Sequence, residues 1–310
     1  MVSDTETPRR MWDAVERFHA GPVYLEPECR AEAAAAGCRG FWMGYFATRA
    51  APMGAVGAAT VESIFFYFSP GRVRRAIPDA WTYTTPAAVL AARRRGVDAA
   101  LRRLLGDDAG GPELAEAAEL ARRAAVAGTT LGRPLYAAWA DLDWPDAPHE
   151  VLWHAATLLR EHRSGAHLWA LAAHELDGCE AVVLHAAADG APLAWIEGEA
   201  GWSPEEAAAA RQRLAVRGWL DGHGRATERG LAVRADIEAL TDAHDLAPWR
   251  ALGATACDRL AKLLGGLNRH FPPDDQLDWQ HHYGPNQHGA SPEPDEPGPA
   301  DVGATVSTGR

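Results

Sequence analysis

Apolar residues recur every three to four positions along most of the chain, which is the spacing of amphipathic α-helices. Alternation with a period of two, which would indicate β-strands, is nearly absent. Several predicted helices also have readable starts: Ser203–Pro204 with Glu206 is a capping-box pattern, and Thr85–Pro86 is a similar start. The pattern predicts a mainly α, multi-helix fold with helices over residues 8–19, 27–37, 40–50, 57–68, 71–77, 86–105, 112–127, 148–163, 166–175, 178–187, 203–217, 228–243 and 252–266.

The segment from Trp202 to Asp236 carries the β-structure that we expect in this chain. A helix over 203–217 is followed by the apolar pair Trp219–Leu220, then by turn residues 221–224, and Thr227 caps a second long helix. A helix, a short two-stranded wing and a helix form the second half of a winged helix. We therefore expect a winged-helix-like C-terminal portion with a short β-wing.

Breaks in the periodicity suggest how the chain is divided. The proline-containing stretch 144–148 interrupts the helical pattern, and from Pro272 onward the chain is rich in Pro, Gly, Asp and Ser without periodicity. We predict a helical N-terminal domain over 1–145, a winged-helix-like domain over 146–270 and a disordered acidic tail over 271–310.

Charge and composition argue against several classes of binding partner and several classes of enzyme. The formal net charge is −12 over 310 residues, so attraction to nucleic acid or to an anionic membrane is not expected. No apolar run approaches the ~20 residues that span a bilayer, and the polar N-terminus has no secretory signal, which predicts a soluble cytoplasmic protein. The four cysteines match no metal pattern, and no P-loop, dinucleotide fingerprint, nucleophile elbow or kinase signature is present.

One histidine-rich stretch is a candidate site. A pocket between helices lined by His162, His167 and His185 would suit a divalent metal, a haem or an anionic ligand. The alternative is that these histidines cap helices or hydrogen-bond buried carbonyls. No HExxH or facial-triad spacing is present, so metal ligation is the weaker interpretation and no cofactor is firmly implied. Five histidines lie in this stretch: His154, His162, His167, His174 and His185.

An aromatic cluster around one arginine is a second candidate. In FWMGYFATRAAPMG (41–54), the aromatic residues cover one helix face and Arg49 follows a turn later, with four more aromatics at 65–68. Such a setting suits an acidic aromatic or planar ligand whose carboxylate pairs with the guanidinium. The alternative is an aromatic core in which Arg49 bridges to a carboxylate such as Glu62.

Two resemblances support these predictions. Residues 213–230, RLAVRGWLDGHGRATERG, resemble part of the MarR-type transcription regulators. In a DNA complex the helix at 203–217 would enter the major groove, but Glu205 and Glu206 at its leading end would repel phosphate. Longer segments are similar to an actinobacterial family of helix-turn-helix-like proteins, which implies that fold and no particular activity: FWMGYFATRAAPMGAV (41–56), FYFSPGRVRRAIPDAW (66–81), LWHAATLLREHRSGAHLWAL (152–171), LDGCEAVVLH (176–185), GWSPEEAAAARQRLAVRGWL (201–220) and LTDAHDLAPW (240–249).

The sequence thus predicts a small-molecule-binding protein, a ligand sensor or accessory protein, on a winged-helix-like scaffold. Two alternatives stay open: an enzyme that uses a histidine-lined metal or haem site, and a MarR-like transcription regulator. The long helices would also allow a homodimer. The predicted ligand contacts are Arg49, Trp42, Tyr45, Phe66, His162 and His167.

Overall fold

The computed structural model describes residues 7–189, 196 and 198–271, and most of these residues are helical, which confirms the mainly α prediction. The predicted disordered tail lies, apart from Phe271, outside the described residues. The chain begins with α1 (Thr7–Ala20), η1 (Gly21–Leu25), α2 (Pro27–Ala35), α3 (Gly40–Ala50), η2 (Ala51–Met53), α4 (Ala58–Ile64), α5 (Pro70–Arg74), α6 (Ala80–Tyr83), α7 (Pro86–Leu105) and η3 (Gly106–Gly110). It continues with α8 (Pro112–Ala125), α9 (Pro134–Ala140), α10 (Pro148–Ala173), α11 (Gly178–Asp189), α13 (Pro204–Val216), α14 (Glu228–His244), α15 (Leu246–Leu252), α16 (Ala254–Leu267) and η4 (Asn268–His270).

Local capping chemistry sets several helix starts where the sequence predicts them. The Ser203 hydroxyl accepts a hydrogen bond from the Glu206 backbone N–H at 3.2 Å, and the Glu206 carboxylate accepts one from the Ser203 backbone N–H at 2.8 Å. This is the reciprocal capping box, and it opens α13. Thr85 likewise caps α7, because its hydroxyl accepts from the backbone N–H of Ala88.

Helix α10 is longer than the sequence predicts. We expected two helices, 148–163 and 166–175, separated at Ser164–Gly165, whereas one helix runs through this pair from Pro148 to Ala173. Gly165 remains helical, and its missing side chain makes room for Arg133: a Cβ there would lie 2.6 Å from the Arg133 Cγ. The glycine therefore serves close packing in this helix and does not end it.

The predicted β-wing is wrong. No strand occurs in the part of the chain that the structure describes, and between α13 and α14 there is only an isolated antiparallel pairing of Leu220 with Ala226. The Asp221 carboxylate accepts hydrogen bonds from the backbone N–H groups of His223 and Arg225, which folds this segment into a tight turn. Too few residues remain on either side of the turn for a ladder, so the C-terminal portion is helical with a loop in place of a wing.

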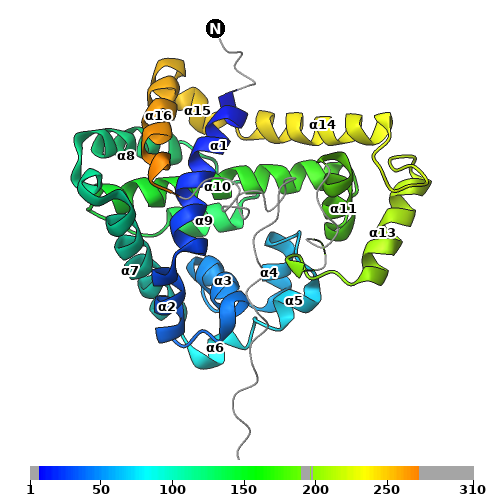
Figure 1. The fold of residues 1–310 in the computed structure, drawn as a ribbon, viewed down its shortest axis with the longest axis horizontal. Helices are drawn as coiled ribbons and strands as arrows, with labels where there is room; N and C mark the ends of the chain where they lie inside the picture. Colours follow the sequence, from blue (N-terminus) through cyan, green and yellow to red (C-terminus); the bar gives the residue numbers. More distant parts are fainter. Residues whose placement is uncertain (1–6, 190–195, 197, 272–310) are drawn as a thin grey trace, which may run out of the picture.

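Two hydrophobic cores share α10, which runs through the middle of the molecule in Figure 1. The larger core lies among α1, α3, α7, α8, α15, α16 and the first half of α10, and the second lies among α11, α13, α14 and the second half of α10. The predicted domain boundary after residue 145 falls just before α10. Helix α10 contributes side chains to both cores: Leu152–Leu159 lie in the larger core, and Ala170 and Leu171 lie in the second.

None of the described helices combines the length and the apolarity that crossing a membrane requires.

Candidate functional site

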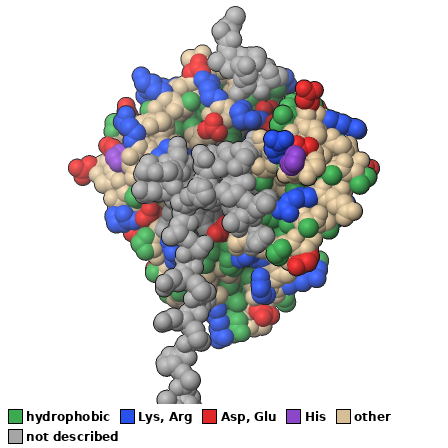
Figure 2. All heavy atoms as spheres, turned by 45° about the vertical axis from the view of Figure 1, so that its right-hand side comes forward, with side chains coloured by type: hydrophobic (Ala, Val, Ile, Leu, Met, Phe, Trp, Pro, Cys, Tyr) green, Lys and Arg blue, Asp and Glu red, His purple; other side chains and the backbone are tan. Residues whose placement is uncertain are grey.

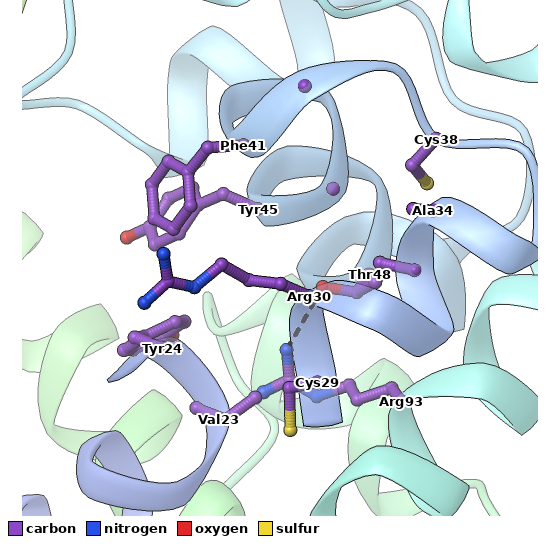
Figure 3. Close-up of a pocket in the computed structure, with 13 residues that line it drawn as sticks. Val23, Tyr24, Cys29, Arg30, Ala34, Cys38, Phe41, Tyr45, Thr48 and Arg93 are labelled. Atoms are coloured by element: carbon purple, nitrogen blue, oxygen red, sulfur yellow. Dashed lines mark hydrogen bonds between the residues drawn. The ribbon is translucent and has the colours of Figure 1, made fainter. Parts of the chain in front are cut away.

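A cavity of about 230 Å³ opens among η1, α2, α3 and α7 (Figure 3). Small side chains on the facing helices α2 and α3 leave this space open, and Gly37, at a φ of 103°, makes the turn between them. The cavity is lined by Val23, Tyr24, Cys29, Arg30, Ala33, Ala34, Cys38, Gly40, Phe41, Gly44, Tyr45, Thr48 and Arg93.

Aromatic rings form the walls of this cavity. In Figure 3 the rings of Phe41 and Tyr45 lie on one side and that of Tyr24 on the other, with the guanidinium group of Arg30 between them. Arg30 is exposed, whereas Tyr24 and Tyr45 are buried. The cavity thus has an apolar, aromatic body and a basic, solvent-facing mouth, which is the usual composition of a small-molecule site.

Arg93 is the polar group at the inner end of the cavity. It belongs to the buried face of α7, and only 3% of its surface is exposed. Its Nη1 donates to the Thr48 hydroxyl at 3.2 Å, and its guanidinium carbon lies 5.2 Å and 4.9 Å from the ring centroids of Trp139 and Trp153. The buried Nε–H has no hydrogen-bond partner. Other arginines also have a buried Nε without a partner, among them Arg49 and Arg72, but Arg93 is the one of these that lines the cavity.

A buried ion network lies behind the cavity. One oxygen of Glu161 accepts hydrogen bonds from Arg49 and from Arg160, both at 2.9 Å, and Arg160 also pairs with Glu16 at 3.2 Å. Arg49 additionally donates to the hydroxyl of Tyr45 at 2.6 Å, which connects the network to the cavity wall. Burial raises the pKa of Glu16 to about 7 and also raises that of Glu161.

Three titratable groups that line the cavity, Tyr24, Cys29 and Cys38, are neutral at neutral pH. Burial raises the pKa of the Tyr24 phenol and that of the Cys29 thiol to about 12 each. Burial also raises the pKa of Cys38. None of these three side chains therefore supplies a negative charge to the guanidinium of Arg93.

The structure separates most of the residues predicted to contact a ligand. Tyr45 lines the cavity, whereas Arg49 lies behind it and pairs with Glu161 rather than with Glu62, the partner of Arg74. Trp42 packs against the larger core, with the Arg72 guanidinium 4.3 Å from its ring centroid. Phe66 packs against the second core.

The predicted histidines lie elsewhere and apart from one another. His162 is fully buried, and its Nδ1 lies 2.6 Å from the carboxylate of Asp245. His167 lies between the hydroxyls of Tyr67 and Thr241, and burial lowers its pKa to about 4. The third, His185, accepts a hydrogen bond from Arg234 at 3.1 Å.

The three histidines do not form a metal-binding group. Within the described ranges, the one set of three potential ligands whose donor atoms lie within 4.8 Å of one another is Asp98, His149 and Glu150. Both carboxylates in that set are already held in ion pairs, Asp98 by Arg102 and Glu150 by Arg94. This set therefore belongs to a partly buried ion-pair cluster.

Arg93, the buried arginine at the inner end of the cavity, is not among the ligand contacts predicted from the sequence. The sequence pattern nevertheless indicates its burial, because it lies on the same helical stripe as Val89, Gly96 and Val97, all of which are buried. The adjacent Arg94 and Arg95 lie off this stripe and pair with carboxylates at the surface. A helical projection of α7 would therefore have distinguished the first arginine of the run from the next two.

Comparison with known proteins adds a family. A profile of a helix-turn-helix family matches residues 8–276, which is most of the chain and all of the described part but its first residue. The chain belongs to this helix-turn-helix family. No curated protein and no solved structure was found to match it.

In this helix-turn-helix family member, two arginines at the C-terminal end of α13, Arg213 and Arg217, are engaged within the molecule. Arg213 pairs with Asp177 and Glu180. Arg217 stacks on Trp219, 3.6 Å from the ring centroid, and donates to the carbonyls of His174 and Glu175. On the face that Figure 2 brings forward, basic and acidic side chains are interspersed. This arrangement differs from the continuous basic surface that phosphate backbones attract.

Proposed function

We propose that this helix-turn-helix family member binds a small organic molecule in the cavity among η1, α2, α3 and α7, and acts as a ligand sensor or accessory protein. One observation carries the proposal. The cavity has aromatic walls and ends at a buried arginine whose Nε–H has no partner. A molecule bound in the cavity can satisfy this group.

The size of the cavity supports this function. An engineered cavity of about 150 Å³ lined by apolar side chains is known to bind benzene. The cavity here measures about 230 Å³ and opens to solvent beside the exposed residues Arg30 and Ala34. It therefore has room for one substituted aromatic ring and a route by which that ring can enter.

Binding of DNA is the second candidate, and the family match is the observation that favours it. The charges described above weigh against it, because α13 begins with the exposed acids Glu205 and Glu206. We therefore place ligand binding first.

The test uses the full chain and three probes, phenol, indole and benzoate. Ala34 lines the cavity and Ala35 does not, and both are exposed near the end of α2, so Ala34→Trp and Ala35→Trp form a matched pair. Ligand-observed NMR should show at least one probe bound to the wild type and to Ala35→Trp, and lost from Ala34→Trp. Absence of binding by all three probes, or equal binding to Ala34→Trp, would overturn the proposal.

A further inference from the structure

We infer that the ligand of this cavity is a small aromatic carboxylate, and that its carboxylate binds the guanidinium of Arg93. The inference rests on the proposed function and specifies the chemical class of the ligand. It also assigns the anchoring role to Arg93 instead of Arg49, whose charge is already matched by Glu161.

A charge count around the cavity indicates an anion. Three arginines are almost fully buried there, Arg49, Arg93 and Arg160, each at most 3% exposed, and arginine stays charged in proteins. Two buried carboxylates, Glu16 and Glu161, face them and are shared between Arg49 and Arg160. The arginines thus outnumber the carboxylates, and Arg93 is the one of the three that forms no hydrogen-bonded ion pair with either, although the charge of Glu161 acts on it at longer range.

The immediate surroundings of Arg93 do not supply a directly bonded negative charge. No ion pair joins it to a carboxylate in the described part of the chain, and its one hydrogen-bond partner there is the neutral hydroxyl of Thr48. The rings of Trp139 and Trp153 contact its guanidinium, but a ring face cannot accept the in-plane N–H groups at full strength. A carboxylate can, because its two oxygens match the fork of N–H groups.

The rest of the cavity indicates the body of the ligand. Phe41, Tyr45 and Tyr24 present rings to the cavity, and a flat apolar group would replace the Arg30 guanidinium that lies between them. The volume of about 230 Å³ limits the ligand to roughly one ring with a substituent. Aromatic walls disfavour a strongly hydrated dianion such as inorganic phosphate. The Thr48 hydroxyl can also turn its proton toward a carboxylate oxygen bound at Arg93.

The experiment compares benzoate with benzamide, which has nearly the same shape and no charge, on the full chain by isothermal titration calorimetry. Hydrogen bonds to charged groups predict that benzoate binds about tenfold to a hundredfold more tightly than benzamide. In Arg93→Gln the ratio of the two affinities should fall to about one. Arg94→Gln alters the next residue of α7, whose partner Glu150 lies outside the cavity lining, and should keep the preference.

Each alternative outcome has a distinct meaning. Equal affinity of the wild type for benzoate and benzamide, with both lost in Ala34→Trp, would overturn the anion inference and leave the proposed function standing. A benzoate preference that survives Arg93→Gln but is lost in Arg30→Gln would move the anchor to the mouth and overturn the assignment to Arg93.

Binding of phenol or indole alone would also overturn the inference, whereas binding of none of the probes would remove the proposed function as well. The comparison within the wild type needs no variant, so it stands even if Arg93→Gln fails to fold.

Discussion

Four consecutive side chains on α10, Arg160 to Arg163, are buried and charged or titratable, and they point to two different parts of the molecule. Arg160 and Glu161 face Glu16 of α1 and Arg49 of α3. His162 and Arg163 face Asp245, with Arg163 also reaching carboxylates of α14. Such groups are tolerated in a core only when each is matched, so the sequence run specifies how α10 is rotated against its neighbours.

We predict that Arg160→Met destabilises the protein strongly. The change leaves Glu16 and Glu161 buried beside one another with one guanidinium fewer, and breaking a buried ion pair from one side costs about 3–5 kcal/mol. Urea denaturation at neutral pH measures the loss. Arg95→Met is the control, since its pair with Glu32 is largely exposed and should contribute less than about 1 kcal/mol.

The same variant carries a pH signature. The pKa of Glu16 is raised to about 7 against 4.5 in the unfolded chain, so its contribution to stability is fully present below pH 4.5 and is lost as the pH rises toward 7. Without Arg160, which lowers the pKa of both glutamates, that loss becomes larger. The destabilisation by Arg160→Met should therefore be greater at pH 8 than at pH 5. A destabilisation independent of pH would contradict this explanation.

His154 gives the opposite pH dependence. Burial between the rings of Trp139 and Trp144 lowers its pKa to about 4 from 6.5, so the unfolded chain binds a proton that the folded chain excludes between these values. Its contribution is fully present above pH 6.5 and is lost as the pH falls to 4. In His154→Leu this decline should be shallower by about 1 kcal/mol per pH unit, as measured by urea denaturation between pH 7 and 4.5. His223→Leu, in an exposed turn, should keep the wild-type decline.

At the residue scale, the sequence located the aromatic cluster but not its chemistry. Tyr45 does line a cavity, and Arg49 does lie beside the aromatic residues. The partner of Arg49 is Glu161, 112 positions along the chain. That Arg93 has no carboxylate partner becomes visible only when distant helices are brought together. Local patterns cannot report which of several arginines is left without a carboxylate.

At the scale of elements, helix starts were predictable because they depend on neighbouring residues. The capping box at Ser203 and the cap at Thr227 are both present. The wrongly predicted β-wing between α13 and α14 has a local cause as well. The apolar pair Trp219–Leu220 predicts the start of a strand, but the Asp221 carboxylate closes the turn so tightly that a single bridge forms. At this position the hydrogen bonds of the Asp221 side chain favour a turn over a strand.

A close approach of backbones positions α11, and it leads to a prediction. A Cβ added at Gly178, the first residue of α11, would fall on the backbone carbonyl oxygen of Phe66, which cannot move aside cheaply. We expect Gly178→Ala to lose about 1–3 kcal/mol of unfolding free energy. Gly265 is exposed on α16 with no atom near its virtual Cβ, so Gly265→Ala should gain about 0.5–1 kcal/mol instead. Shifts of the same sign in both variants, by urea denaturation, would contradict this packing argument.

At the scale of the whole molecule, the proposed ligand site and α13 belong to different cores. The cavity adjoins the larger core, whereas α13 packs in the second, and α10 is shared by both. Tyr45 contacts Arg49, and the buried ion network continues to Arg160 of α10. Further along the same helix, His162 and Arg163 reach Asp245 and α14. If the cavity holds a ligand as proposed, α10 is the element through which binding would reach the second core.

The overall charge of the molecule also bears on DNA binding, and we predict that α13 does not bind DNA. The chain carries a net charge of −12, α13 starts with two exposed acids, and one of its two arginines, Arg213, is paired with Asp177 and Glu180. Fluorescence anisotropy with a labelled duplex at about 50 mM salt should show no binding, with or without benzoate, because phosphate contacts supply most of non-specific affinity.

A gain-of-charge variant makes that negative result informative. Ala208 and Ala209 are exposed on α13 beside Glu205, so Glu205→Arg combined with Ala208→Arg and Ala209→Arg reverses the charge of this face without touching the buried residues Ala207, Ala210 and Leu214. If electrostatics alone prevent binding, this variant should bind the duplex with an affinity that falls steeply as salt rises, while the wild type stays inert. Salt-sensitive binding by the wild type would show that the paired arginines are released on contact with DNA, and the charge argument would then fail.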